Sequence, residues 1–174
     1  QLIHVKAIGD YTIVGDTLDD AAGEAFDKTA QLLGLGYPGG LALSNLAEKG
    51  GPFFTLPRPL LNSHEFNFSF SGLKTSVLTL VKKQEVLNQS IKANIAFEFQ
   101  EAITDVLVKK SFLALEHLNL NQLIVSGGVG ANKKLREKLI KLSLKNNFKV
   151  SFPAFEFCTD NGAMIALAGA LRYH

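Results

Sequence analysis

Two short stretches near the end of the chain carry residue types that can bind a nucleotide. Residues 123–132 read Leu-Ile-Val-Ser-Gly-Gly-Val-Gly-Ala-Asn, and residues 157–164 read Phe-Cys-Thr-Asp-Asn-Gly-Ala-Met. In the first stretch an apolar run ends in a glycine turn before a helical pattern, which brings bare backbone amides up to a phosphate. The second stretch sets an acid, Asp160, at the mouth of the last helix. Together they predict a nucleotide site with an acid nearby. In the turn, the residues expected to contact the nucleotide are Gly127, Gly128 and Asn132.

The glycine turn matches neither of two common nucleotide motifs. No Gly-Lys-Ser/Thr follows it, which excludes a Walker-type loop, and Gly128-Val129-Gly130 lacks the third glycine or alanine of a dinucleotide fingerprint. The turn would therefore bind through its amides and the Asn132 side chain. The alternative is a tight strand-to-helix turn in which Asn132 only caps the helix.

Three acids fall on one stripe of the first helical pattern. Asp20, Glu24 and Asp27 follow a spacing of four and three residues, which places them on one helix face. Carboxylates suit the hydroxyls of a ribose or a bound cation, but composition favours a solvated face with Glu24 paired to Lys28. The Gly-Gly pair ending at Gly40 is either a plain turn or a place where a flat ring approaches the backbone.

Asp160 is the best candidate metal ligand, because hard and borderline cations take carboxylate oxygen. The alternative is an acid favoured by a helix N-terminus. Further ligands would have to come from outside this chain, because the histidines lie far apart: His4, His64, His117 and His174. Cys158 fits a small buried residue better than a nucleophile.

Composition is that of one globular domain. The chain has 174 residues, 47% of them hydrophobic and 20% charged, with a net charge of +2, which is too mild to establish nucleic-acid binding. A single cysteine excludes an intrachain disulfide and fits a reducing cytoplasm. No apolar run approaches membrane-spanning length, and no signal-peptide pattern is present. Because Gln1–Val5 reads as the middle of a strand, we expect a fragment of a longer protein.

The periodicity of apolar residues predicts an α/β fold. The second half alternates strands with helices, which favours βαβ units and a mainly parallel sheet. The first half should hold a hairpin, a helix and an irregular surface loop. The expected elements are strands 2–7 and 11–15, helices 19–33 and 41–48, a loop over 50–65, strand 66–70, a helix over 72–81 capped by Ser71, helix 90–117, strand 121–126, helix 131–145, strand 148–152 and a helix from Asn161.

Five motifs, in order along nearly the whole chain, resemble the tRNA threonylcarbamoyladenosine-synthesis transferase family (bacterial TsaD), whose members were once described as O-sialoglycoprotein endopeptidases. The motifs are residues 19–28 (DDAAGEAFDK), 37–40 (YPGG), 68–75 (FSFSGLKT), 126–132 (SGGVGAN) and 158–164 (CTDNGAM). The departures are Leu41 in place of the family's proline and Gly130 in place of its serine or alanine.

The resemblance implies a two-lobed actin/hexokinase/Hsp70-like (ASKHA) fold, of which residues 1–174 would be the C-terminal lobe, without the first strand and the N-terminal lobe. It places Asp27, Gly40 and Asn132 at adenylate-binding positions and Asp160 at the carboxylate that completes a metal site. The metal would be one divalent ion, iron(II) with zinc as the alternative, acting as a Lewis acid on the acyl-adenylate.

The implied activity of the full-length protein is transfer of a threonylcarbamoyl group from threonylcarbamoyl-AMP to the adenosine beside the anticodon in tRNA. The implied partners are tRNA, a smaller paralogous subunit (TsaB) and an ATPase subunit (TsaE), all in the cytoplasm. We expect the chain alone to be inactive and to self-associate through its N-terminal strand edge, with the helix over 19–33 poorly covered. Two other hypotheses are a metalloendopeptidase and a non-catalytic nucleotide-binding or assembly lobe.

Overall fold

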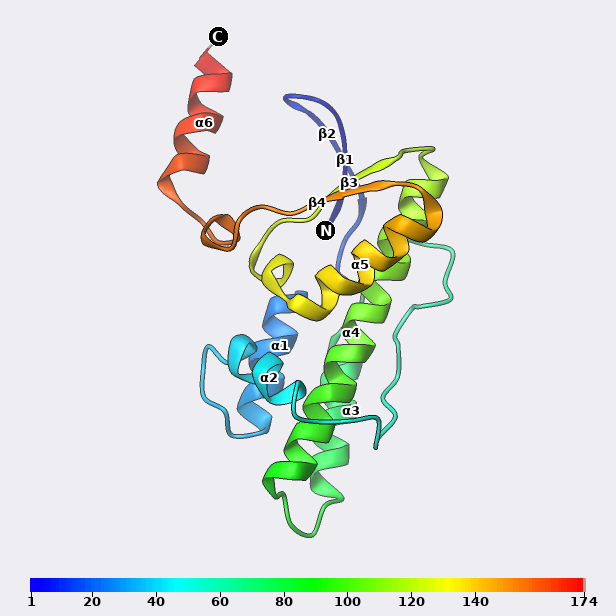
Figure 1. Cartoon of the computed structure of the whole chain (residues 1–174), viewed down its shortest axis with the longest axis vertical. Helices are drawn as coiled ribbons and strands as arrows, with labels where there is room; N and C mark the ends of the chain where they lie inside the picture. The colour runs from blue at the N-terminus through cyan, green and yellow to red at the C-terminus, as the bar shows by residue number, and fades with distance from the viewer. Residues whose placement is uncertain (174) are drawn as a thin grey trace.

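The computed structural model describes residues 1–173 and has helices packed beside short strands. This confirms the α/β class, and most of the expected elements form (Figure 1). Two single-turn 3-10 helices, η1 (Gly128–Ala131) and η2 (Phe155–Phe157), interrupt the second half. The other elements are β1 (Leu2–Ala7), β2 (Asp10–Gly15), α1 (Ala22–Leu32), α2 (Gly40–Ala47), α3 (Ser71–Lys82), α4 (Gln89–His117), β3 (Gln122–Ile124), α5 (Lys133–Asn146), β4 (Lys149–Ser151) and α6 (Gly162–Tyr173).

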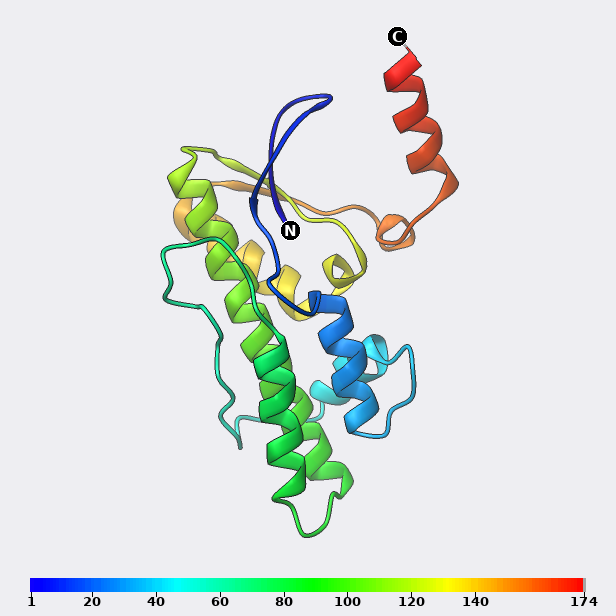
Figure 2. The same cartoon turned by 180° about the vertical axis from the view of Figure 1, so that it is seen from behind.

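The core is helical and is built around α4. Figures 1 and 2 show α1, α2 and α3 beside the lower half of this helix and α5 across its upper half. The apolar side chains of α4 recur at helical spacing and are fully buried at Ile95, Phe99 and Ile103. Phe26 of α1 meets Phe99 edge to face, with ring centroids 5.2 Å apart. Burial of each such side chain stabilises the fold by about 1.5–3 kcal/mol.

The strands form two separate pairs and not one sheet. β3 and β4 pair in parallel, with Leu123 opposite Val150, whereas β1 and β2 form an antiparallel hairpin. The expected parallel sheet is therefore limited to β3 and β4. The hairpin extends away from the helical core around α4 (Figure 1). No strand among the described residues joins it to the other pair.

The expected strand over residues 66–70 is wrong. Phe68 makes only an isolated bridge to Thr17, and its ring stacks on that of Phe70 at 5.9 Å. Both rings are almost fully buried. The Phe68 backbone pairs with Asp16 and Leu18 at this one point, and the pairing does not continue into a ladder. The alternation of phenylalanines therefore reports which side chains enter the core.

Ser71 does not cap α3 as expected, because Asp19 from a distant segment takes that role. The Asp19 carboxylate accepts hydrogen bonds from the backbone N–H of Phe70 (2.7 Å) and of Ser71 (3.1 Å). It also accepts from the hydroxyls of Ser69 (2.6 Å) and Ser71 (2.8 Å). Burial raises the pKa of Asp19, but these four hydrogen bonds outweigh it and lower the pKa to about 2.

We expect Asp19→Asn to destabilise the chain more at neutral pH than in acid. Because the folded pKa of Asp19 lies below its ordinary value of 3.8, its stabilisation is present above that value and is lost as the pH falls toward 2. Allowing for the exposed position, the difference at pH 7 should be about 1 kcal/mol. Urea unfolding at pH 7 and pH 2.5 measures it, with Asp10→Asn on the hairpin as control. A difference that is equal at both pH values would contradict the assignment.

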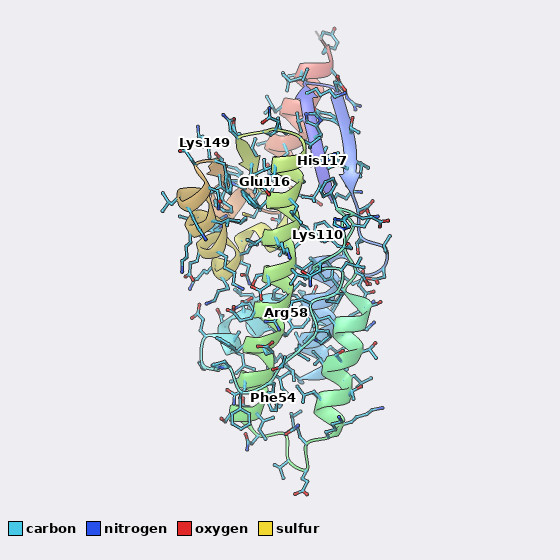
Figure 3. All side chains as sticks on the ribbon, turned by 90° about the vertical axis from the view of Figure 1, so that its right-hand side faces the viewer. Phe54, Arg58, Lys110, Glu116, His117 and Lys149 are labelled. Carbon is cyan, nitrogen blue, oxygen red and sulfur yellow. The ribbon has the colours of Figure 1, made fainter. Side chains whose placement is uncertain are left out.

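The segment over residues 50–65 is irregular, as predicted, but it is fixed to α4. Arg58 forms ion pairs with Glu98 and, at 3.1 Å, with Asp105. Fully buried Lys110 donates to the Ser63 hydroxyl at 2.7 Å. Figure 3 shows Arg58 beside the middle of α4 and Lys110 higher along the same helix. The loop therefore belongs to the rigid part of the molecule.

Many of the exposed large apolar residues lie on the hairpin and on α6, and none of them lies on α1. Val5 is 60% exposed and Ile165 is 74% exposed, whereas Phe26, at 4%, is covered. The expectation that the first helix is poorly covered is therefore wrong, because α2 and α3 pack against it. Self-association through the hairpin edge stays a prediction. None of the helices in residues 1–173 is long and apolar enough to cross a membrane.

Candidate functional site

Asp27 and Gly40 are brought together at the start of α2. The Asp27 Oδ1 atom accepts hydrogen bonds from the backbone N–H of Gly39 (2.9 Å) and Gly40 (2.8 Å). A side chain at Gly39 would not fit, because a Cβ there would lie 2.3 Å from the Cβ of Ala30. The second oxygen, Oδ2, has no hydrogen-bond partner among the described residues. It can therefore accept a hydrogen bond from a ligand hydroxyl.

Asn132 caps α5 and joins it to two other helices. Its Oδ1 accepts from the Leu135 backbone N–H at 2.9 Å, and its Nδ2 donates to Ser44 Oγ (3.0 Å) and Gln100 Oε1 (2.9 Å). The cap fixes the orientation of the amide, because only its oxygen can accept from an N–H. The predicted cap is thus confirmed, but Asn132 does more than cap the helix, and its contact with a nucleotide stays a prediction. Since both amide hydrogens are used inside the protein, Asn132 can contribute to a ligand site by holding α5 against α2 and α4.

Ser44 links Asn132 to the Asp27 pair. Its hydroxyl donates to the Gly40 carbonyl oxygen at 3.0 Å and accepts from Asn132 Nδ2. Asp27, Gly40 and Asn132, which are separated by up to 105 positions in the sequence, therefore lie on one path of hydrogen bonds. Three of the predicted site residues are brought into one place by this path.

The glycine turn presents two open amides. Gly127 has φ +86°, which disfavours other residues. The backbone N–H groups of Gly127 and Gly128 have no hydrogen-bond partner among residues 1–173, and both residues are exposed. A Cβ at Gly23 would lie 3.6 Å from the Val129 side chain, which places the turn against the start of α1 (Figure 2). These amides can donate to an anionic oxygen.

The other two acids predicted on this helix face are paired with lysines, and one of them, Asp20, lies before α1, which begins at Ala22. Asp20 pairs with Lys28 at 2.7 Å and with Lys74 at 3.2 Å, and Glu24 also pairs with Lys28 at 2.7 Å. Hydrogen bonding from Lys28 is the main cause that lowers the pKa of Asp20. The solvated ion-pair interpretation is confirmed for Glu24. Of the three acids, Asp27 alone keeps a carboxylate oxygen without a partner within the described part of the chain.

Arg136 connects the glycine turn to the segment that leads to Asp160. Its guanidinium donates to the Gly130 carbonyl oxygen at 2.7 Å, to the Pro153 carbonyl oxygen at 3.1 Å and to Cys158 Sγ at 3.3 Å. It also lies over two aromatic rings, those of Phe152 at 4.9 Å and Phe155 at 4.2 Å. The Arg136 side chain therefore fixes the position of the glycine turn relative to the segment that carries Asp160.

Asp160 is exposed at the start of α6, and no hydrogen bond to its carboxylate forms within residues 1–173. Its neighbour Asn161 caps α6 by accepting from the Met164 N–H at 3.0 Å. No group of three or more metal-ligating side chains gathers in the described part of the chain, and His174 lies outside it. These residues do not enclose a metal by themselves. Cys158 is buried, as expected.

The sequence reasoning missed Ser44, Gln100 and Arg136. Gln100 carried a signal, since a polar residue among apolar helix positions is buried only where it finds a partner. Ser44 follows Gly40 by one helical turn. Arg136 lies on the lysine-rich α5, and nothing local in the sequence marks its long-range contacts.

We expect Asn132→Ala to lower the free energy of unfolding by about 2–3 kcal/mol. The change removes the helix cap, worth about 1 kcal/mol, and leaves the buried Gln100 amide oxygen unpaired, at about 1–3 kcal/mol. Asn132→Asp keeps the cap but not the two donors, so it should retain part of the stability. Urea unfolding of the three proteins measures both contributions. Equal stability of the alanine variant and the parent would exclude the bridging role.

Comparison with known proteins identifies relatives along the whole chain. The family described as tRNA N6-adenosine threonylcarbamoyltransferase (TsaD) matches residues 1–167. The relative from Methylobacillus flagellatus, named tRNA N6-adenosine threonylcarbamoyltransferase, is 63% identical over 174 residues, which cover 99% of this chain and 51% of that protein. Relatives of the same name from Thiobacillus denitrificans and Nitrosomonas eutropha are 62% and 61% identical over 173 residues, 99% of this chain and 50% and 51% of those proteins. The chain spans about half the length of the curated relatives it matches.

Proposed function

Because the chain belongs to the tRNA N6-adenosine threonylcarbamoyltransferase family, we propose that it supplies one part of an enzyme that transfers a threonylcarbamoyl group to the N6 amine of an adenosine in tRNA. Family membership implies an ASKHA-type fold. Within that fold, residues 1–174 would form the C-terminal lobe. The nucleotide would lie between this lobe and the part of the longer relatives that the chain does not span.

The free Oδ2 atom of Asp27 is the observation that carries the proposal. Asp27 Oδ1 is occupied by the Gly39 and Gly40 amides, so the orientation of the carboxylate is fixed before a ligand arrives. A ribose hydroxyl of threonylcarbamoyl-AMP would donate to Oδ2. The open amides of Gly127 and Gly128 would donate to the phosphate of the same molecule. Gly40 lacks a side chain, which lets the nucleoside approach the backbone.

The reaction requires mainly positioning from these residues. The N6 amine attacks the carbamoyl carbon, the bond from that carbon to the phosphate oxygen breaks, and AMP leaves with the electron pair. The amine loses one proton as the new bond forms, and that proton passes to the released phosphate or to water. Amides fixed near the phosphate would stabilise the charge that develops on the leaving group. Holding the two reactants together replaces a bimolecular encounter with an effectively unimolecular step. Asn132 contributes by fixing α5 against α2 and α4.

Asp160 would supply one oxygen ligand to a divalent metal, iron(II) or zinc. Its exposed carboxylate, free of hydrogen bonds within the described residues, supports that role. Because the described residues form no metal cluster, the other ligands would come from the part of the longer relatives that this chain does not span. The bound ion would supply Lewis-acid polarisation of the acyl-adenylate. The further partners in the cytoplasm would be tRNA and the TsaB and TsaE subunits.

A non-catalytic assembly lobe is the second candidate, and the exposure of α6 favours it. Leu167 and Tyr173 of this helix are 62% and 90% exposed. A metalloendopeptidase is supported less, because it needs a glutamate beside paired histidines and the described residues bring no such group together.

A hybrid protein can test the proposal. This chain replaces the matching half of the Methylobacillus flagellatus relative, with which it shares 63% identity, and the product is called the hybrid below. Calorimetric titration with a non-hydrolysable analogue of threonylcarbamoyl-AMP should give one binding site per hybrid. A folded hybrid that does not bind the analogue, while the relative itself binds it, would overturn the nucleotide site and favour the assembly lobe.

A further inference from the structure

One stripe of α5 carries four lysines, of which two pair with acids of α4 and two have no acidic partner among the described residues. Lys134, Lys138, Lys141 and Lys145 lie on one helical stripe. Glu101 pairs with the first two, at 3.3 and 2.8 Å. Lys141 and Lys145 are exposed and form no ion pair with any described residue. The charge therefore remains at the C-terminal end of the helix.

A groove of about 420 Å³ lies where α5 ends and β4 begins. Exposed Lys149, which has no ion pair among the described residues, is the next residue after this groove. Figure 3 shows Lys149 and Glu116 beside the upper part of α4. The groove is lined mainly by asparagines and aromatic rings, namely Phe112, Asn119, Asn121, Asn146, Asn147 and Phe148.

The polar groups of this groove are available to a ligand. The side chains of Asn119, Asn121 and Asn147 are exposed and have no hydrogen-bond partner in residues 1–173. The rings of Phe112 and Phe148 lie 5.7 Å apart. Amide groups can bind the edges of unpaired bases and aromatic rings can stack on their faces, while lysines bind phosphates. The acids in this region are Glu116 and Glu137.

We propose that Lys141, Lys145 and Lys149, with the asparagine groove, form a contact surface for an RNA strand. The inference rests on the proposed function, in which the substrate is tRNA. The nucleotide site and the RNA contact surface lie at opposite ends of α5, because the glycine turn precedes the first residue of this helix and Lys145 lies near its last residue. At 1.5 Å per residue, Lys145 is about 18 Å from the start of the helix. A single RNA molecule can therefore reach both ends.

The asparagines also have a backbone role, which the experiment must separate from binding. Asn119 and Asn147 have φ of +53° and +54°, a conformation that asparagine tolerates at helix ends. Glycine tolerates it as well. Asn119→Gly/Asn147→Gly therefore removes both amides and preserves the turns. A purely structural role predicts no change in RNA binding for this variant.

The first test compares two triple variants of the 174-residue chain in fluorescence anisotropy with a labelled, unmodified tRNA transcript over a series of KCl concentrations. The binding variant is Lys141→Gln/Lys145→Gln/Lys149→Gln. The control, Lys49→Gln/Lys82→Gln/Lys83→Gln, removes the same charge from exposed lysines without ion pairs among the described residues. The binding variant should raise Kd by about 10- to 100-fold and reduce the salt slope by about 2.

Any other result contradicts the proposed RNA contact surface. Equal weakening by both triples would assign binding to net charge alone, and failure of the parent chain to bind tRNA would remove the surface altogether. Capture of anionic vesicles through the same lysines, without tRNA binding, would assign it to lipid. Asn119→Gly/Asn147→Gly should raise Kd by about 3- to 30-fold, and an unchanged Kd would remove the groove from the surface. In the hybrid, the lysine variant should still bind the adenylate analogue, so failure of the surface is distinct from failure of the proposed function.

Discussion

Asp27→Asn in the hybrid should weaken binding of the adenylate analogue by about 1–3 kcal/mol, or about 5- to 150-fold, because a buried polar contact is lost. Asparagine keeps an oxygen for the Gly39 and Gly40 amides but replaces Oδ2 with an NH₂ group, which cannot accept from a ribose hydroxyl. The variant therefore separates ligand binding from the capping of α2. Titration calorimetry measures the difference.

The control for this change is Asp10→Asn, at an exposed residue of the hairpin, which removes the same charge far from α2. It should bind the analogue as the parent does. If Asp27→Asn also binds like the parent and melts at the same temperature, Asp27 only caps α2 and the ribose contact is excluded. A fall in melting temperature without a change in affinity leads to the same conclusion.

Arg136→Met should release the segment that carries Asp160 from the body of the protein. The change removes hydrogen bonds to Gly130, Pro153 and Cys158 and two ring contacts. Hydrogen bonds of a charged donor contribute about 1.5–3 kcal/mol each, although they are not additive. We expect the free energy of unfolding to fall by about 2–4 kcal/mol. The rate of amide hydrogen exchange should increase more over residues 153–161 than over α4.

Two further variants give this result its specificity. Arg136→Lys keeps the charge but lacks the planar fork that reaches three acceptors at once, so it should restore only a small part of the protection. Lys141→Met, at an exposed position of the same helix, should leave amide exchange unchanged. Uniform acceleration across the whole chain in Arg136→Met would show a general loss of stability and contradict the local coupling.

The helices could be predicted from sequence because their signals are local. Apolar spacing gives α4 its buried face at Ile95, Phe99 and Ile103, and Asn132 stands where a cap is expected. The alternation of Phe68 and Phe70 misled for a related reason. A strand needs a hydrogen-bonded neighbour, and no residue within the segment tells whether that neighbour exists.

The candidate site was predictable only in part. The residues alone marked Asp27 as one of three acids and Gly40 as part of a turn, and the family resemblance placed both at adenylate-binding positions. The free Oδ2 atom of Asp27 is visible only in the structure. Asp19 capping α3 and Arg136 joining the two motifs depend on residues far away in the sequence. Local periodicity carries no information on such contacts. The same limit applies to Ser44, whose hydroxyl joins two predicted site residues.

Incorporation of labelled threonine into unmodified tRNA tests the central claim most directly. The hybrid would be supplied with the threonylcarbamoyl-AMP generating system and the partner subunits of the Methylobacillus flagellatus relative. The account predicts that threonine is incorporated at N6 of an adenosine in tRNA, and that Asp27→Asn reduces the rate at least tenfold while Asp10→Asn does not. A folded hybrid that binds tRNA and adenylate but transfers no threonylcarbamoyl group would contradict the claim.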